Sequence, residues 1–278
     1  MRRLPRPTIT AQEVLELCIA SIRDVSLTKR LRLAAPVINA AEANYVSRGQ
    51  QAKLHTIVGT NGVAGHVTTA EMERVYKGTF VRSVNTRDIY GAIKSAPEND
   101  MCPLCSQRTV STLDHYLPQS AHPTLTVTSA NLVPACAECN KTKLALEAET
   151  AGDQTFHPYF EDADDARWLF AEVQEISPAA LVFSPVPPTT WANIKQQRIA
   201  AHFKTFGLAS LYASHSAVEL NNIRFGLQEL ARRNTPQQIS DHLRRRAESC
   251  AAVHVNSWQR ATYDALANST WFCSGGFM

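Results

Sequence analysis

The chain has 278 residues, 44% of them hydrophobic and 19% charged, with a formal net charge of +3. This length suits one large domain or two smaller ones of an ordinary globular protein. The sequence has no apolar run near the roughly eighteen residues that a membrane-spanning helix needs, so we expect no membrane partner. The first residues do not resemble a secretory signal, which favours the cytoplasm. Short basic clusters such as 244–246 could follow a phosphate backbone or form a solvated helix face.

Residues 1–98 are predicted to form an N-terminal helical region. Apolar residues at helical spacing predict helices over residues 11–24, 31–50 and 69–76. Pro36 is expected to interrupt the second of these helices, because proline cannot donate the backbone hydrogen bond of a helix interior.

Two Cys-x-x-Cys pairs follow, and they are separated by the segment 106–135. Each pair can place two sulfurs on one tight turn, and two such turns complete a tetrahedron. The alternative, a pair of disulfides or unrelated buried thiols, is disfavoured in a reducing compartment. The sequence therefore predicts a structural zinc site whose ligands are Cys102, Cys105, Cys136 and Cys139. The remaining cysteines have apolar neighbours and are predicted to be packing residues; they are Cys18, Cys250 and Cys273.

The segment around these pairs has a predicted order of strand, loop, strand and helix. A β-prone run over 109–113 ends on Asp114 and His115, and a second short strand at 132–133 is expected to stop at Pro134. Strong helix formers then run from Asn140 to Glu149. The zinc would join the base of the hairpin to the start of the helix. A closed four-cysteine site has no open coordination position, so any chemistry must come from the residues that it holds in place.

Asp114-His115, Asn131 and Asn140, set within this cysteine frame, resemble the motif of the HNH endonucleases, which are ββα-metal nucleases, in a bacterial variety with a four-cysteine zinc site. The resemblance implies that His115 is the general base and that Asn131 braces the hairpin. It also implies that Asp114 and Asn140 hold a catalytic Mg²⁺ or Mn²⁺ ion. Asn140 stands where the family often has histidine, and this known variation favours a hard cation with oxygen ligands.

The same residue types suit phosphodiester hydrolysis on chemical grounds. The reaction needs a base to take a proton from water and a cation to offset charge on the scissile phosphate, and a carboxylate beside an imidazole can supply both. Adjacent side chains of a regular strand face opposite sides, so Asp114 and His115 can converge only where the strand ends or distorts. Pro118, three residues later, fits such an end.

Three basic residues near the motif are candidate nucleic-acid contacts. Lys143 follows Asn140 by three positions and would share its helix face, where it could meet a phosphate or remain a solvated lysine. Arg82 and Arg87, in the segment before the first cysteine pair, could reach the substrate.

Residues 161–278 are predicted to form a β-hairpin followed by a helical domain. The strands are expected over 168–173 and 181–184, and the helices over 190–205, 208–233, 235–251 and 256–268. The aromatic tail from Trp271 to Met278 is expected to pack on this domain. The predicted fold class is therefore α+β and mostly helical, with a zinc-stabilised nuclease core over 99–160 between two helical regions.

Two functions remain open from the sequence. The first is a metal-dependent endonuclease, for which the resemblance implies DNA as the default substrate, with RNA left open. The resemblance also implies a bacterial restriction or anti-phage system, in which an ATPase or another subunit could be the partner. The second is a non-catalytic zinc module that binds nucleic acid or a protein, in which Asp114 and His115 are incidental.

Overall fold

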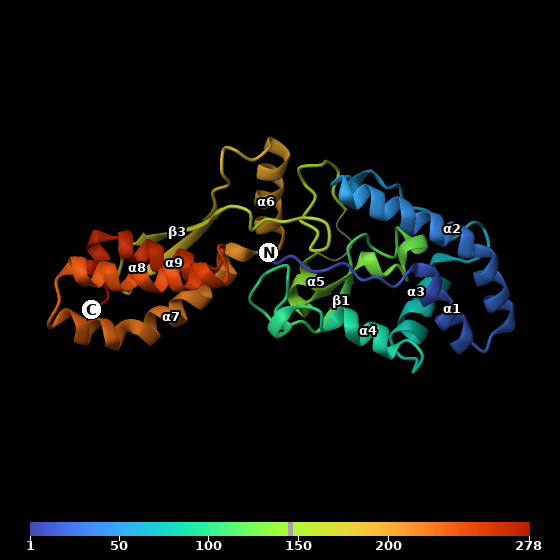
Figure 1. The fold of residues 1–278 in the computed structure, drawn as a ribbon, viewed down its shortest axis with the longest axis horizontal. Helices are drawn as coiled ribbons and strands as arrows, with labels where there is room; N and C mark the ends of the chain where they lie inside the picture. The colour runs from blue at the N-terminus through green and yellow to red at the C-terminus, as the bar shows by residue number, and fades with distance from the viewer. Residues whose placement is uncertain (144–146) are drawn as a thin grey trace. The chain divides into compact units, whose positions relative to one another are not determined.

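The computed structural model describes residues 1–143 and 147–278, and over these residues the chain is α+β and mostly helical, with two small antiparallel sheets (Figure 1). This confirms the predicted fold class at its coarse level. The chain divides into two compact units, Met1–Asp162 and Ala163–Met278, and the predicted N-terminal region and the cysteine segment belong to the same unit. Within the described ranges, no helix is both long and apolar enough to cross a membrane.

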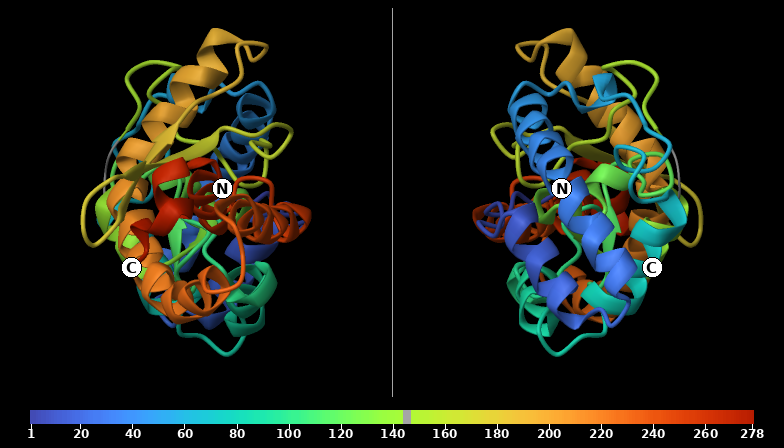
Figure 2. Two further views of the ribbon diagram at one scale, coloured as in Figure 1. Left: turned by 90° about the vertical axis from the view of Figure 1, so that its left-hand side faces the viewer. Right: turned by 90° about the vertical axis from the view of Figure 1, so that its right-hand side faces the viewer.

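The first unit begins with two helices that pack side by side, α1 (Ala11–Ser21) and α2 (Val25–Gln50) (Figure 2). The predicted break at Pro36 and the predicted start at residue 31 are both wrong, because α2 starts at Val25 and runs through the proline. Buried side chains on both sides of Pro36 hold the helix against the core, and this burial offsets the lost backbone hydrogen bond. They are Leu31, Ala34 and Ile38.

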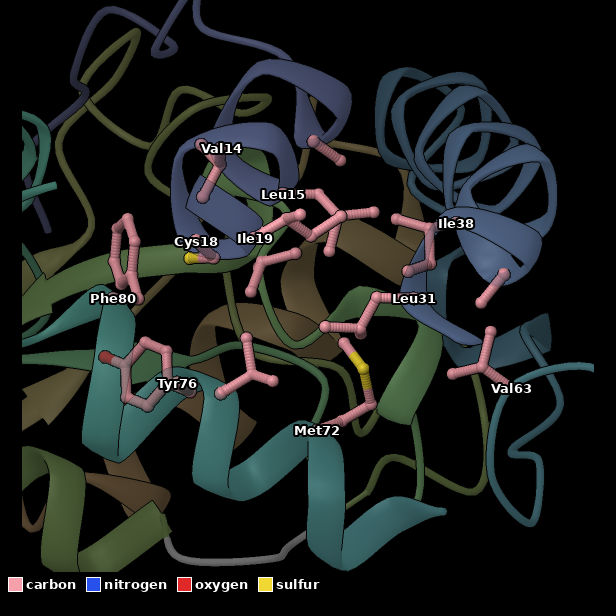
Figure 3. Close-up of a cluster of buried hydrophobic side chains, with 14 of the residues drawn as sticks. Val14, Leu15, Cys18, Ile19, Leu31, Ile38, Val63, Met72, Tyr76 and Phe80 are labelled. Atoms are coloured by element: carbon pink, nitrogen blue, oxygen red, sulfur yellow. The ribbon is translucent and has the colours of Figure 1, made fainter. Parts of the chain in front are cut away.

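The next helix, α3 (Thr69–Arg74), continues directly into a π-helical turn over Val75–Phe80 and is followed by α4 (Arg87–Lys94). Side chains from α1, α2, α3 and this turn meet in one core (Figure 3). The same core includes Leu113 and Leu132, so the helices are packed directly behind the hairpin that carries the predicted site.

That hairpin pairs β1 (Thr112–His115) with β2 (Leu132–Ala135) in antiparallel register, with His115 opposite Leu132. Pro134 does not stop the second strand as predicted. It lies within β2 opposite Leu113, because a two-stranded sheet has only edge strands and an edge strand tolerates proline.

The helix after β2 is α5 (Ala137–Lys143), which begins three residues before Asn140. The predicted continuation over 144–146 lies outside the described residues. Residues 147–149 are not helical, so that end of the predicted helix is wrong.

Residues 157–160 pack the end of the first unit against α2 and the hairpin. The Tyr45 hydroxyl lies 3.0 Å from His157 Nε2, and a Cβ atom on Gly49 would lie 2.5 Å from the Phe160 ring. The Tyr159 hydroxyl donates to the Leu132 carbonyl of β2 at 2.8 Å. This segment therefore supports the hairpin from the side of α2.

The second unit contains the predicted hairpin, β3 (Leu169–Gln174) and β4 (Ala180–Pro185), and the predicted helices. The helices are α6 (Asn193–Thr205), α7 (Leu208–Ala231), α8 (Pro236–Val253) and α9 (Trp258–Asn268). Strand β3 packs on α9 and β4 packs on α7. The tail packs as expected, because Phe272 and Phe277 are buried and their rings lie 5.5 Å apart.

Candidate functional site

The four predicted zinc ligands come together in one buried cluster. The sulfur atoms of Cys102, Cys105, Cys136 and Cys139 all lie within 4.8 Å of one another. Zinc–sulfur bonds of about 2.3 Å in a tetrahedron place sulfurs roughly 3.8 Å apart, so small movements would complete the geometry. The cluster could therefore hold a structural metal such as zinc. Of the other cysteines, Cys18 and Cys273 are buried as predicted, whereas Cys250 is only half-buried.

Backbone amides support the two cysteine turns. Cys105 Sγ accepts from the Arg108 amide at 3.5 Å, and Cys136 Sγ accepts from the Cys139 amide at 3.3 Å. Amide donors of this kind stabilise thiolate ligands and fix their direction. The first turn precedes β1 and the second leads from β2 into α5, so a metal here would join the base of the hairpin to the start of the helix.

A cleft of about 660 Å³ lies beside the hairpin, and it brings together residues from α3, β1 and α5. Its walls include Asp114 and His115, which are adjacent on β1, together with Asn140. The strand ends at His115, and this meets the condition for two neighbouring side chains to share one cleft. Arg82 and Arg87 are exposed, and neither is among the described residues that line the cleft.

The His115 imidazole is held by a backbone carbonyl. Its Nε2 atom lies 2.8 Å from the Thr126 oxygen, and because a carbonyl only accepts, Nε2 must donate. In the neutral ring, Nδ1 then carries the lone pair. Burial lowers the pKa of His115 to about 4, even though the bond to Thr126 acts in the opposite direction. The ring is therefore neutral near pH 7, and Nδ1 is its unprotonated nitrogen.

Tyr76 packs edge-on against the His115 ring, with the ring centroids 4.5 Å apart. This contact, together with the Thr126 bond, restricts the imidazole from two sides. The ring is thus held in one orientation.

Asp114 forms a buried ion pair with Lys143 of α5. The Lys143 ammonium lies 3.1 Å from Asp114 Oδ2 and donates to the His115 carbonyl at 2.8 Å. Asp114 is 5% exposed and Lys143 is 4% exposed. Burial raises the pKa of Asp114, and the neighbouring ammonium counteracts part of that shift. Lys143 is therefore not the solvated helix lysine that one reading of the sequence offered.

Asn140 is half-buried on α5, one helical turn before Lys143, and lines the same cleft as Asp114. Its carboxamide oxygen and the Asp114 carboxylate are both hard donors of the type that Mg²⁺ and Mn²⁺ prefer. The donor set in the cleft fits such an ion.

Asn131 is fully buried behind the cleft and braces the loop between the strands. Its Oδ1 atom accepts from the Leu117 amide at 2.8 Å, and its Nδ2 atom donates to the carbonyls of Leu117 at 3.0 Å and Leu125 at 3.3 Å. These bonds hold both ends of the segment that presents the Thr126 carbonyl to His115.

Some residues of the site were not predicted as site residues from the sequence, in which the aromatics of the run from Glu73 to Tyr90 were expected to be core. Glu73 and Tyr76 line the cleft from α3 and the π-helical turn, far before the cysteine pairs along the chain. Thr126 acts through its backbone carbonyl, so its side chain could not reveal its role. Only the tertiary packing brings these groups to His115.

Comparison with known proteins gives one full-length similarity. The chain is similar to protein ea31 of Escherichia phage lambda, with 26% identity over 296 aligned positions that cover 99% of this chain and 100% of ea31. No family model matches the chain. No solved structure matches it either.

Proposed function

We propose that this protein is a metal-dependent endonuclease of the HNH, or ββα-metal, type, with β1, β2 and α5 as its nuclease core. The observation that carries the proposal is the position of His115. Its Nε2 atom is committed to the Thr126 carbonyl, and its ring shares a cleft with Asp114 and Asn140.

In this proposal His115 Nδ1 takes the proton from the attacking water. A base must be unprotonated to act, and the burial that lowers the pKa of His115 keeps it so near neutral pH. Thr126 and Tyr76 keep the ring in one orientation, so the base needs no reorganisation at the moment of reaction.

Asp114 and Asn140 would hold the catalytic divalent ion, Mg²⁺ or Mn²⁺, through their side-chain oxygens. Such an ion, when bound, offsets negative charge on the scissile phosphate and on the departing oxygen. The four cysteines would hold a structural zinc that fixes the base of the hairpin to α5, and Asn131 would support the loop behind the base.

The substrate in this proposal is nucleic acid, with DNA favoured over RNA by the resemblance to HNH enzymes. Arg82 and Arg87 are exposed outside the cleft wall, where they could contact phosphates away from the reacting bond. The small net charge of +3 gives little non-specific attraction to DNA. This supports a partner subunit, such as the ATPase of a defence system, that supplies target binding in the cytoplasm.

The Asp114–Lys143 ion pair favours a second candidate, the non-catalytic zinc module. A lysine that neutralises Asp114 is what a purely structural hairpin would need, because a buried carboxylate without a partner is costly. The two candidates differ in whether Asp114 can bind a divalent ion.

A cleavage assay with the zinc-loaded chain separates them. Wild type, Asp114→Asn and a control, Asp88→Asn, which changes an exposed carboxylate on α4, would be incubated with plasmid, single-stranded DNA and transfer RNA. We expect wild type and the control to cleave DNA with Mg²⁺ or Mn²⁺ but not with EDTA, and Asp114→Asn to be inactive. Cleavage by Asp114→Asn at the wild-type rate, or no cleavage by the wild type, would contradict the proposal.

A further inference from the structure

Lys143 has a more specific position than a general phosphate contact requires. Its ammonium lies between the Asp114 carboxylate at 3.1 Å and the His115 carbonyl at 2.8 Å, and it lies 5.8 Å from the centre of the Tyr116 ring. All of these partners are on β1 or directly after it. The Lys143 side chain comes from α5, and its ammonium therefore lies beside Asp114, the proposed metal ligand on β1.

A buried lysine at this position satisfies two groups at once. The Asp114 carboxylate gains a counter-charge, and the His115 carbonyl, at the end of β1, gains a donor. Both Asp114 and Lys143 are nearly excluded from water, so neither charge would be compensated by solvent if its partner left. In the metal-free site, the negative charge of Asp114 and the positive charge of Lys143 therefore compensate each other.

A divalent ion at Asp114 would be placed close to this ammonium. Two cations held by one buried carboxylate repel each other strongly, because little water is present to screen them. A metal ion that binds Asp114 must therefore displace the ammonium or bind more weakly in its presence.

We propose that Lys143 is the resident counter-cation of Asp114 in the metal-free protein, and that it competes with the divalent ion for this carboxylate. The competition sets the metal affinity of the site, and it keeps the Asp114 charge compensated until an ion arrives. The proposal rests on the proposed function for the assignment of Asp114 as a metal ligand. It makes Lys143 a positioning residue of the site.

Removing the ammonium should therefore strengthen metal binding. In the zinc-loaded full-length chain, Lys143→Met should bind Mn²⁺ at least about tenfold more tightly than wild type, as measured by electron paramagnetic resonance of the free ion. Lys141→Met is the matched control, because Lys141 is an exposed lysine on the same helix, and it should bind Mn²⁺ as wild type does. Asp114→Asn should lose the site.

Thermal stability gives a second readout that does not depend on activity. Without Mn²⁺, Lys143→Met should melt below wild type, because Asp114 is left buried without a counter-charge. Saturating Mn²⁺ should narrow this difference, because the ion then supplies the missing positive charge.

The outcomes distinguish this proposal from the proposed function. If Asp114→Asn abolishes Mn²⁺ binding but a folded Lys143→Met binds no more tightly than wild type, the competition is refuted and the nuclease proposal stands. If Asp114→Asn binds Mn²⁺ as wild type does, the metal is not at Asp114 and both proposals fail.

A measurement on the wild type covers the case in which Lys143→Met does not fold. The side-chain ammonium signal of Lys143 can be followed by NMR in ¹⁵N-lysine protein and assigned by its loss in Lys143→Arg. If Lys143 and Mg²⁺ compete for the Asp114 carboxylate, this signal should shift or broaden as Mg²⁺ fills the site. An unchanged Lys143 signal at saturating Mg²⁺ would overturn the proposal.

Discussion

His115 Nε2 donates to the carbonyl oxygen of Thr126 at 2.8 Å, and this single bond determines which imidazole nitrogen can act as a base. The resulting tautomer carries hydrogen on Nε2 and a lone pair on Nδ1. Long-range ¹H–¹⁵N correlation spectra of the metal-free protein near pH 7 should show this tautomer for His115. A spectrum with the hydrogen on Nδ1 would remove the proposed base.

The cysteine cluster predicts a metal requirement for stability. Cys102→Ser should reduce the bound zinc below that of the wild type and lower the free energy of unfolding by several kcal/mol, because a metal held by the four cysteines would join the hairpin to α5. Elemental analysis and chemical denaturation measure the two effects. The control, Cys250→Ser, changes a half-buried cysteine of the second unit and should keep the zinc. Equal zinc content in both variants would contradict the assignment.

Asn131 should contribute to stability through its three buried hydrogen bonds. Asn131→Ala removes the partner of the Leu117 amide and of the Leu117 carbonyl, and the Leu125 carbonyl keeps only its bond from the Thr128 amide. We therefore expect a loss of about 2–4 kcal/mol in the free energy of unfolding. Urea denaturation measures this loss. Asn61→Ala, at an exposed asparagine of the same unit, should change stability by no more than about 0.5 kcal/mol. A comparably small effect of Asn131→Ala would show that the loop does not depend on it.

Glu71 should make the stability of the first unit depend on acid pH. The two hydrogen bonds from Arg30 of α2, at 2.7 and 2.8 Å, are the largest cause of a lowered pKa, which falls from 4.5 to about 2. Because the folded-state pKa is below the unfolded one, this contribution is complete above about pH 4.5 and is lost as the pH falls toward 2.

Glu71→Gln tests that pH dependence. It should be less stable than wild type at pH 7, and the difference should shrink between pH 4.5 and pH 2 in urea titrations. A difference that stays constant over this range would contradict the assigned pKa.

The sequence predicts those parts of the site whose geometry is determined by residues close to one another along the chain. Two residues between cysteines define a tight turn, and the two turns meet because a short hairpin returns the chain to its start. The β-prone run over 109–113 likewise predicted a strand that β1 overlaps, although β1 starts only at Thr112 and includes Asp114 and His115. The amphipathic patterns predicted the helices of the second unit.

The parts that could not be predicted depend on tertiary contacts. Local rules place a break at Pro36 and an end at Pro134, yet burial on both sides carries α2 through the first and an edge strand accommodates the second. No spacing rule indicates that Lys143 turns inward to Asp114, or that Glu73 comes to line the cleft. These contacts follow from how α3 and α5 pack on the hairpin.

The most direct test of the central claim is the rate of Mg²⁺-dependent plasmid cleavage by His115→Ala, measured on protein that keeps its zinc and its circular dichroism spectrum. His66→Ala, at an exposed histidine of the same unit, is the control and should cleave as wild type does. We predict that His115→Ala cleaves at least about 100-fold more slowly, because the water has lost its base. Wild-type cleavage by a folded, zinc-bearing His115→Ala would contradict the account.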